Sequence, residues 1–154
     1  MDKLREIIAY VLKEYPLKEE LSNARVTKLI YLSDWHQAIH QHRQISPIQW
    51  YFDNFGPYVP DVQNKVAECS DIFGYEHTFN VFGKPKTIFT LTNESYQPAL
   101  DDLEKQSINH VINETSKLNW DSFIKLVYST YPVISSERYS SLDLIDKSNE
   151  YIYT

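Results

Sequence analysis

Two histidines, His36 and His40, lie four residues apart, and this spacing places both imidazoles on one face of a helix. With Asp34 close by, such a pair can contribute ligands to a metal site. The metalloprotease motif also requires a glutamate between the histidines, and none is present here. His77 and His110 stand isolated along the chain. We therefore interpret the pair as polar histidines on a helix surface and expect no metal site.

Other catalytic patterns are equally weak. Cys69 has no neighbouring basic motif to lower the pKa of its thiol, which favours a structural cysteine over a nucleophile. The three glycines of the chain do not form a phosphate-binding loop, and no serine stands in a nucleophile elbow. The pair Asp101–Asp102 falls in the first turn of an expected helix, where the helix dipole explains it. We expect no catalytic residue, no cofactor and no enzyme activity.

Composition points to one globular domain over residues 1–154. The chain has 42% hydrophobic and 23% charged residues, which suffices for a core. No apolar run reaches the roughly 20 residues that a membrane span needs. The first segment is amphipathic and carries acids, unlike a signal or transit peptide. The single cysteine of the chain indicates a reducing compartment, so we expect a cytoplasmic protein without a membrane partner.

The net charge of −6 is concentrated near the C-terminus, where residues 94–154 contain five bases and ten acids. No basic cluster occurs anywhere, which argues against a function in phosphate-driven binding of nucleic acid. An acidic surface in this third of the chain would instead suit a basic surface on another protein.

Hydrophobic spacing predicts a mainly helical chain. Pro16 ends the first expected helix, and Ser22 or Asn23 caps the second. Pro132 is expected to close the fifth, and a sixth is only weakly indicated. The helices are expected at residues 4–15, 22–40, 60–68, 97–118, 120–131 and 139–150.

Two segments read as strands. Residues 45–54 are rich in aromatic side chains and suit a short extended segment, and residues 75–92 form two runs around Gly83–Lys84–Pro85, which predicts a hairpin. The expected fold class is mainly α with a small β-hairpin or sheet (α+β), a single helical domain with an inserted hairpin. This order also allows a winged helix. In a winged helix, the helix before the hairpin would bind DNA. The amide side chains of Gln63 and Asn64 in this helix are accompanied by two acidic residues, so a DNA-binding function is less favoured.

The stretch WYFDNFGPYVPDV, residues 50–62, gathers aromatic side chains around Gly56–Pro57. Because side chains alternate along a strand, we expect Trp50 and Phe52 to be buried and Tyr51 to lie nearer the surface, as does Tyr58. The residues alone leave two interpretations of Gly56–Pro57 open, an element of the fold and part of a contact surface.

The stretch RVTKLIYLSDWHQAIHQHRQISPIQWYFDNFGPYVPDVQNKV, residues 25–66, resembles the core of the Panacea domain of SocA-like proteins from bacteria and phages. With the hairpin and LNWDSFIKLVYSTYP, the resemblance covers about residues 4–132 and leaves the tail, 133–154, unassigned. Asp53 departs from the pattern, since an aromatic residue is common there. Because family members with unlike partners share the Gly-Pro signature, the resemblance implies that Gly56–Pro57 serves the fold. The matching residues are Lys28, Leu29, Ile30, Tyr31, Trp35, Gly56, Pro57, Tyr58, Pro60 and Val62.

The resemblance implies an antitoxin that neutralises a cognate protein toxin, encoded by the adjacent gene, through direct contact. Two alternatives stay open: an adaptor that delivers a toxin or another partner to a protease, and a winged-helix-like DNA-binding regulator. Many toxins act on RNA or nucleotides through basic grooves, so acidic and aromatic side chains are the expected contacts. The candidates are Tyr51, Tyr58, Tyr128, Tyr131, Tyr139, Asp101, Asp102 and Glu104.

Overall fold

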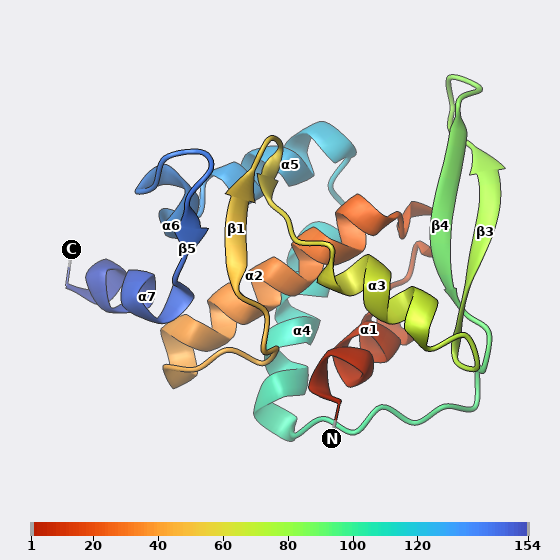
Figure 1. The fold of residues 1–154 in the computed structure, drawn as a ribbon, viewed down its shortest axis with the longest axis horizontal. Coiled ribbons are helices and arrows are strands. Elements are labelled where there is room, and N and C mark those ends of the chain that lie inside the picture. The colour runs from red at the N-terminus through yellow and green to blue at the C-terminus, as the bar shows by residue number, and fades with distance from the viewer. Residues whose placement is uncertain (1, 154) are drawn as a thin grey trace.

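Helices dominate the fold, and the small strands between them pair in antiparallel fashion (Figure 1). The structure is a computed structural model that describes residues 2–153. The predicted fold class is confirmed. In chain order the elements are α1 (Lys3–Glu14), the 3-10 turn η1 (Lys18–Glu20), α2 (Asn23–Gln41), β1 (Trp50–Asp53), β2 (Gly56–Pro57), α3 (Asp61–Glu68), β3 (Phe73–Phe79), β4 (Pro85–Leu91), α4 (Asp102–Thr115), α5 (Trp120–Tyr128), α6 (Tyr131–Ile134), β5 (Ser141–Leu142) and α7 (Leu144–Ile152).

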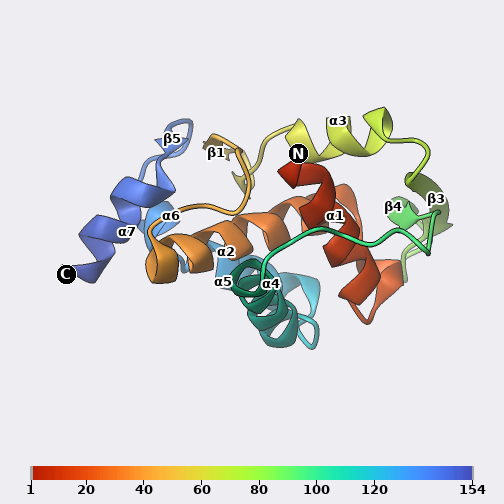
Figure 2. The same ribbon diagram turned by 90° about the horizontal axis from the view of Figure 1, so that it is seen from below.

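Helix α2 is the centre of the molecule. The side chain of Ser22 caps it by accepting a hydrogen bond from the Arg25 amide, as the sequence predicted. Nearly every side chain of the helix up to Ala38 is buried, because α1, α3, α4 and α7 all pack against it. Figure 2 shows α4 and α5 on one side of α2 and β1 and α3 on the other.

A three-stranded sheet in the order β2–β1–β5 lies over α2. Phe52 pairs with Pro57 within the β1–β2 turn, and Trp50 pairs with Leu142 of the C-terminal tail. Trp50 and Phe52 are buried while Tyr51 is exposed, which confirms the predicted alternation. The tail, which the sequence left unassigned, thus supplies β5 and then α7, which packs on α2.

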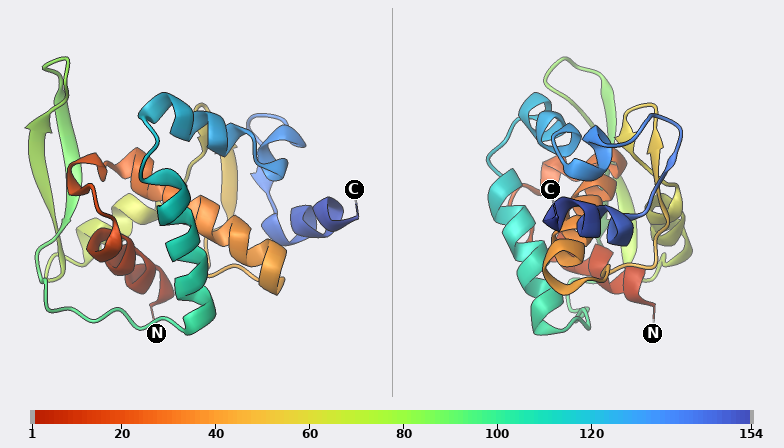
Figure 3. Two further views of the ribbon diagram at one scale, coloured as in Figure 1. Left: turned by 180° about the vertical axis from the view of Figure 1, so that it is seen from behind. Right: turned by 90° about the vertical axis from the view of Figure 1, so that its left-hand side faces the viewer.

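Strands β3 and β4 form the predicted hairpin, paired from Phe73–Leu91 to Phe79–Pro85. The hairpin projects beyond the helices at one end of the molecule, whereas α7 lies at the other end (Figures 1 and 3). Ser22 forms an isolated bridge with Ile88. The connection between α1 and α2 therefore pairs with the hairpin, and β1 and β2 are inserted between α2 and α3.

Three of the predicted helices, which correspond to α4, α5 and α7, have different boundaries in the structure. Pro132 does not close a helix but stands in the first turn of α6, where a missing N–H costs nothing. Helix α4 begins at Asp102 instead of residue 97, because Asp101 supplies the cap. The last helix is α7, Leu144–Ile152, a few residues later than expected, with Asp143 as its cap.

Candidate functional site

The family-like residues Lys28 and Gly56–Pro57, 28 positions apart in sequence, meet in space. Lys28 is only 2% exposed, and its Nζ donates one long hydrogen bond of 3.5 Å to the carbonyl oxygen of Pro57. The same nitrogen lies 6.0 Å from the ring centroid of Tyr58. Burial lowers the pKa of Lys28 to about 8, against the opposing effect of the Asp53 carboxylate. A buried ammonium therefore supports the end of β2.

Tyr31 connects the same helix to two other elements. Its ring meets Trp50 edge-on, with centroids 5.4 Å apart, and its hydroxyl shares a hydrogen bond of 2.8 Å with Thr130. Leu29 is buried in the core. Trp35 lies further along α2, where its ring packs edge-on against Tyr151 of α7. These residues of α2 thus hold β1, the α5–α6 connection and the tail in place.

The backbone conformation at position 56 requires glycine. Its φ of +98° lies in a region that side chains rarely adopt, and an added Cβ would lie 3.4 Å from Cε2 of Tyr128. The Tyr128 ring also packs against Phe52, with centroids 6.1 Å apart. Pro60 precedes α3 as its exposed capping residue. This geometry supports the interpretation of Gly56–Pro57 as part of the fold.

Asp34 anchors the loop before β1, a role that the sequence reasoning missed. Its carboxylate is fully buried and accepts hydrogen bonds from the amides of Ile45 (3.0 Å) and Ser46 (2.9 Å) and from Nε1 of Trp50 (2.8 Å). Burial raises the pKa of Asp34 to about 6, although the hydrogen bonds of Ser46 and Trp50 oppose that rise. The available signal was an acid within the otherwise apolar band of the second helix.

Exposed aromatic side chains surround the β1–β2 turn. Phe55 is 79% and Tyr139 60% exposed, and Tyr51 is exposed on β1. The Tyr139 hydroxyl donates to Oδ1 of Asn54, and its amide donates to the Phe52 carbonyl oxygen at 2.6 Å. We call Tyr51, Phe55 and Tyr139 the turn surface. Sequence reasoning named two of its members but not Phe55.

The remaining candidate tyrosines have other surroundings. Tyr58 is half-buried, near the surface as expected, and its hydroxyl accepts a hydrogen bond from Nδ2 of Asn23 at 2.9 Å. Tyr128 is half-buried beneath Gly56. Tyr131 donates its hydroxyl to Glu150 at 3.1 Å and therefore joins α6 to α7, away from the turn.

The three acidic candidates do not form one exposed cluster. Asp101 and Asp102 are exposed, but Glu104 is buried, so its prediction as a surface charge is wrong. Asp101 and Glu104 form a capping box, and Nζ of Lys3 lies 2.9 Å from Glu104. Arg43 lies 3.4 Å from Asp101. This end of α4 lies near the N-terminus, at the opposite side of Figure 1 from the β1–β2 turn.

His36 and His40 do share a helix face, and a third histidine joins them. His110, which seemed isolated, comes from α4 and stacks on His36, with centroids 4.5 Å apart. Nδ1 of His36 lies 2.8 Å from the Ser107 hydroxyl. Burial, together with the two neighbouring imidazoles, lowers the pKa of His36 to about 4. Within residues 2–153, no group of three or more side chains is arranged to hold a metal ion.

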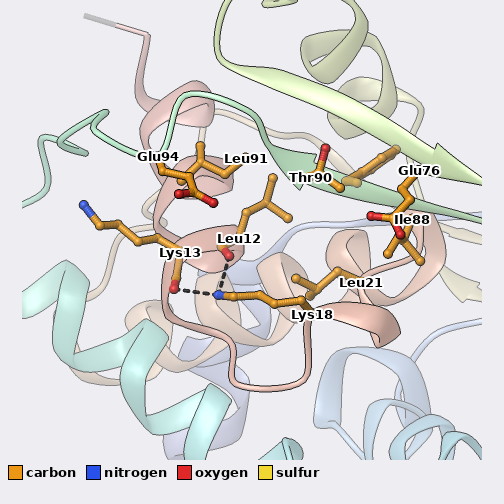
Figure 4. A pocket seen from close by; sticks show the side chains of 10 residues that line it. Leu12, Lys13, Lys18, Leu21, Glu76, Ile88, Thr90, Leu91 and Glu94 are labelled. Atoms are coloured by element: carbon orange, nitrogen blue, oxygen red, sulfur yellow. Dashed lines mark hydrogen bonds between the residues drawn. The ribbon is translucent and has the colours of Figure 1, made fainter.

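Lys18 and Lys28 line different pockets, and the two lysines differ in their hydrogen-bond partners. In a pocket of about 440 Å³ between α1 and β4, Nζ of Lys18 donates to the carbonyl oxygens of Leu12 and Lys13, both at 2.6 Å (Figure 4). That lysine therefore caps the end of α1. The other pocket, about 290 Å³, lies beside the β1–β2 turn and is lined by Ala24, Lys28, Asp53, Asn54, Phe55 and Tyr58.

A second exposed apolar group lies at the tip of the β3–β4 hairpin. Val81 is 94%, Phe82 83% and Phe79 71% exposed. Gly83 in this turn has a φ of +76°, and nothing lies within 4 Å of the place where its Cβ would be. Sequence reasoning identified the hairpin but not its apolar tip. We call these three side chains the hairpin tip.

The comparisons with known proteins give one match. The model of a family described as "Antitoxin SocA-like, Panacea domain" matches residues 26–132. Comparison with curated proteins and with solved structures gives no match. Among the described residues, no helix combines the length and the apolar character needed to cross a bilayer.

Proposed function

The chain belongs to the SocA-like antitoxin family that carries the Panacea domain, and from this premise we propose that it neutralises a cognate protein toxin by direct binding. The match confirms the resemblance carried by residues 25–66. It begins at residue 26 rather than near residue 4, so the first helix lies outside the matched range. An antitoxin role implies a toxin partner, and we expect the adjacent gene to encode it.

The observation that carries the proposal is the turn surface. Phe55 exposes its aromatic ring on the β1–β2 turn, and Tyr139 exposes another beside it. Lys28 and Gly56 of the family core fix this turn from beneath. Tyrosine is enriched among the residues that dominate binding energy, and aromatic side chains provide large contact area with few rotatable bonds. A rigid support lowers the entropy lost on binding. We infer that the toxin covers this surface.

The two alternatives have less support. A DNA reader would use α3, which exposes Gln63 and Asn64 but also Asp61 and Glu68, and the chain has a net charge of −6. Such a surface repels phosphates instead of releasing counterions from them. A protease adaptor would also bind a toxin, so it differs only in what happens to the bound protein.

The decisive experiment is co-expression with the product of the adjacent gene. We expect that product to arrest growth alone, and this chain to restore growth and to co-elute with it at unchanged toxin half-life. A harmless product, or a toxic one that forms no complex, would contradict direct neutralisation. A shortened toxin half-life would identify an adaptor, and salt-sensitive binding to its own promoter at micromolar concentration would favour the regulator.

A further inference from the structure

Lys28 has more hydrogen-bonding capacity than the protein uses. An ammonium carries three N–H donors, yet the only hydrogen bond of Lys28 among the described residues is the 3.5 Å contact with Pro57. No carboxylate within residues 2–153 lies within 4.0 Å of its Nζ. Burying a charge without partners is costly, so a cation retained here gains stability from any group that satisfies it.

The surroundings of Lys28 leave space for such a group. The side chain lines the pocket of about 290 Å³, which we call the Lys28 pocket, together with Phe55 and Tyr58. Phe55 also belongs to the turn surface, so the pocket lies against the surface that we assign to the toxin. The Tyr58 hydroxyl accepts from Asn23 at 2.9 Å, and its own hydrogen has no acceptor among the described residues. Lys28 and Tyr58 therefore offer unused donors at one place.

We propose that the Lys28 pocket receives the carboxylate of an aspartate or glutamate side chain of the bound toxin, which pairs with the Lys28 ammonium. The inference rests on the proposed function, because it names a contact within that complex. A side chain of this size suits the volume of the pocket, and an ionised acceptor makes the stronger kind of hydrogen bond with an ammonium. A partner that covers Phe55 would exclude water from the pocket and so strengthen the pairing.

Asp53 distinguishes a carboxylate from other ligands. Its side chain also lines the pocket, half-exposed, and its Oδ1 accepts from the Asn54 amide at 2.9 Å. An incoming carboxylate is repelled by Asp53, whereas an incoming cation is attracted by it. The buried N–H donors without acceptors belong to Lys28. A carboxylate can accept hydrogen bonds from them, whereas a cation cannot, so we expect the carboxylate as the occupant. Asp53→Asn then removes a repulsion and should tighten the complex.

The test compares Lys28→Met and Asp53→Asn in the full chain by calorimetry against the adjacent-gene protein. Lys28→Met should weaken binding at least tenfold, the loss of about one charge-assisted hydrogen bond. Asp53→Asn should tighten it about two- to fivefold. Methionine removes the long hydrogen bond to Pro57 but also the cost of a buried charge, so the melting temperature should change little.

The outcomes separate this inference from the proposed function. Wild-type affinity in Lys28→Met overturns the carboxylate contact and leaves neutralisation standing. Weaker binding in Asp53→Asn also overturns it, since a cation is then the occupant. If Lys28→Met fails to fold, Asp53→Asn decides alone, and unchanged affinity counts against the contact.

If the wild-type chain forms no complex with the adjacent-gene protein, the proposed function is contradicted. The toxin is then also excluded as the source of the carboxylate. Carboxylate recognition is then measured by NMR titration with N-acetylglutamate N-methylamide and with its glutamine analogue. Preference for the glutamate compound that disappears in Lys28→Met supports the site. Equal shifts with both compounds overturn it.

Discussion

The β1–β2 turn and the β3–β4 hairpin both end in exposed aromatic side chains, yet the protein supports them differently. The first is held by the buried carboxylate of Asp34 before β1, by Lys28 beneath Pro57 and by the Tyr128 ring against Gly56. The second joins the body halfway along its strands, where Ser22 bridges Ile88, and from there it extends beyond the helices (Figure 3).

This difference shows why exposure alone does not identify a binding surface. The hairpin tip exposes more apolar side chain than the turn surface does, since Val81 and Phe82 have almost no cover. A side chain that tertiary contacts already hold in place loses less freedom when a partner binds. The turn surface has such support and the hairpin tip does not, so we assign the toxin contact to the turn surface.

The largest expected effect comes from removing the anchor of the turn. Asp34→Ala leaves the Ile45 amide and the Trp50 indole N–H buried without an acceptor, and we expect a loss of about 3 kcal/mol of unfolding free energy or more. Urea denaturation measures the change. Asp34→Asn keeps one acceptor oxygen and should lose less. Wild-type stability in Asp34→Ala would mean that the turn is not supported from α2.

The next effect compares the two exposed aromatic groups in toxin binding. We expect Phe55→Ser with Tyr139→Asn to weaken the complex about 100-fold, because exposed rings at the centre of a contact carry much of its energy. Asparagine suits position 139, where φ is +68°. Phe79→Ser with Phe82→Ser is the matched control and should change affinity less than threefold, as surface plasmon resonance can measure. If the hairpin-tip variant loses more affinity than the turn-surface variant, the toxin contact lies at the hairpin tip instead.

A smaller effect is the difference in stability cost between substitutions at the two glycines with positive φ, Gly56 and Gly83. Gly56→Val should cost about 2 kcal/mol or more, because backbone strain combines with overlap against the Tyr128 ring. Gly83→Val has the backbone strain alone and should cost about 1 kcal/mol. Thermal unfolding of both variants gives the order. A Gly56 variant that melts like the wild type but no longer binds would make the glycine a contact residue.

The smallest effect concerns the acids at the start of α4. Asp101→Asn with Asp102→Asn keeps a capping side chain, so stability should change little. If the toxin is basic, association should slow about two- to threefold at low salt while dissociation stays the same, because exposed charges act mainly on encounter. Stopped-flow measurements at two salt concentrations test this. An unchanged association rate would leave the acids without a role in binding.

Local chemistry in the sequence determined much of this molecule. The helix that starts after Ser22, the hairpin around Gly83 and the alternating burial of Trp50 and Phe52 all follow from neighbours within a few residues of one another. Caps, turns and side-chain alternation are interactions of this short range, which is why a single sequence reveals them. The family-like motifs are recognisable in the sequence for the same reason, since each is a short run of neighbouring residues.

Tertiary structure alone decided which of those residues meet. Glu104 lies in a predicted helix start, but it is buried because Lys3, about a hundred positions away, pairs with it. The tail became part of the sheet only because Leu142 reaches Trp50, and the Lys28 pocket exists only because β2 returns to α2. Such contacts depend on the path of the whole chain and on burial that no local pattern records, so only the three-dimensional fold determines them.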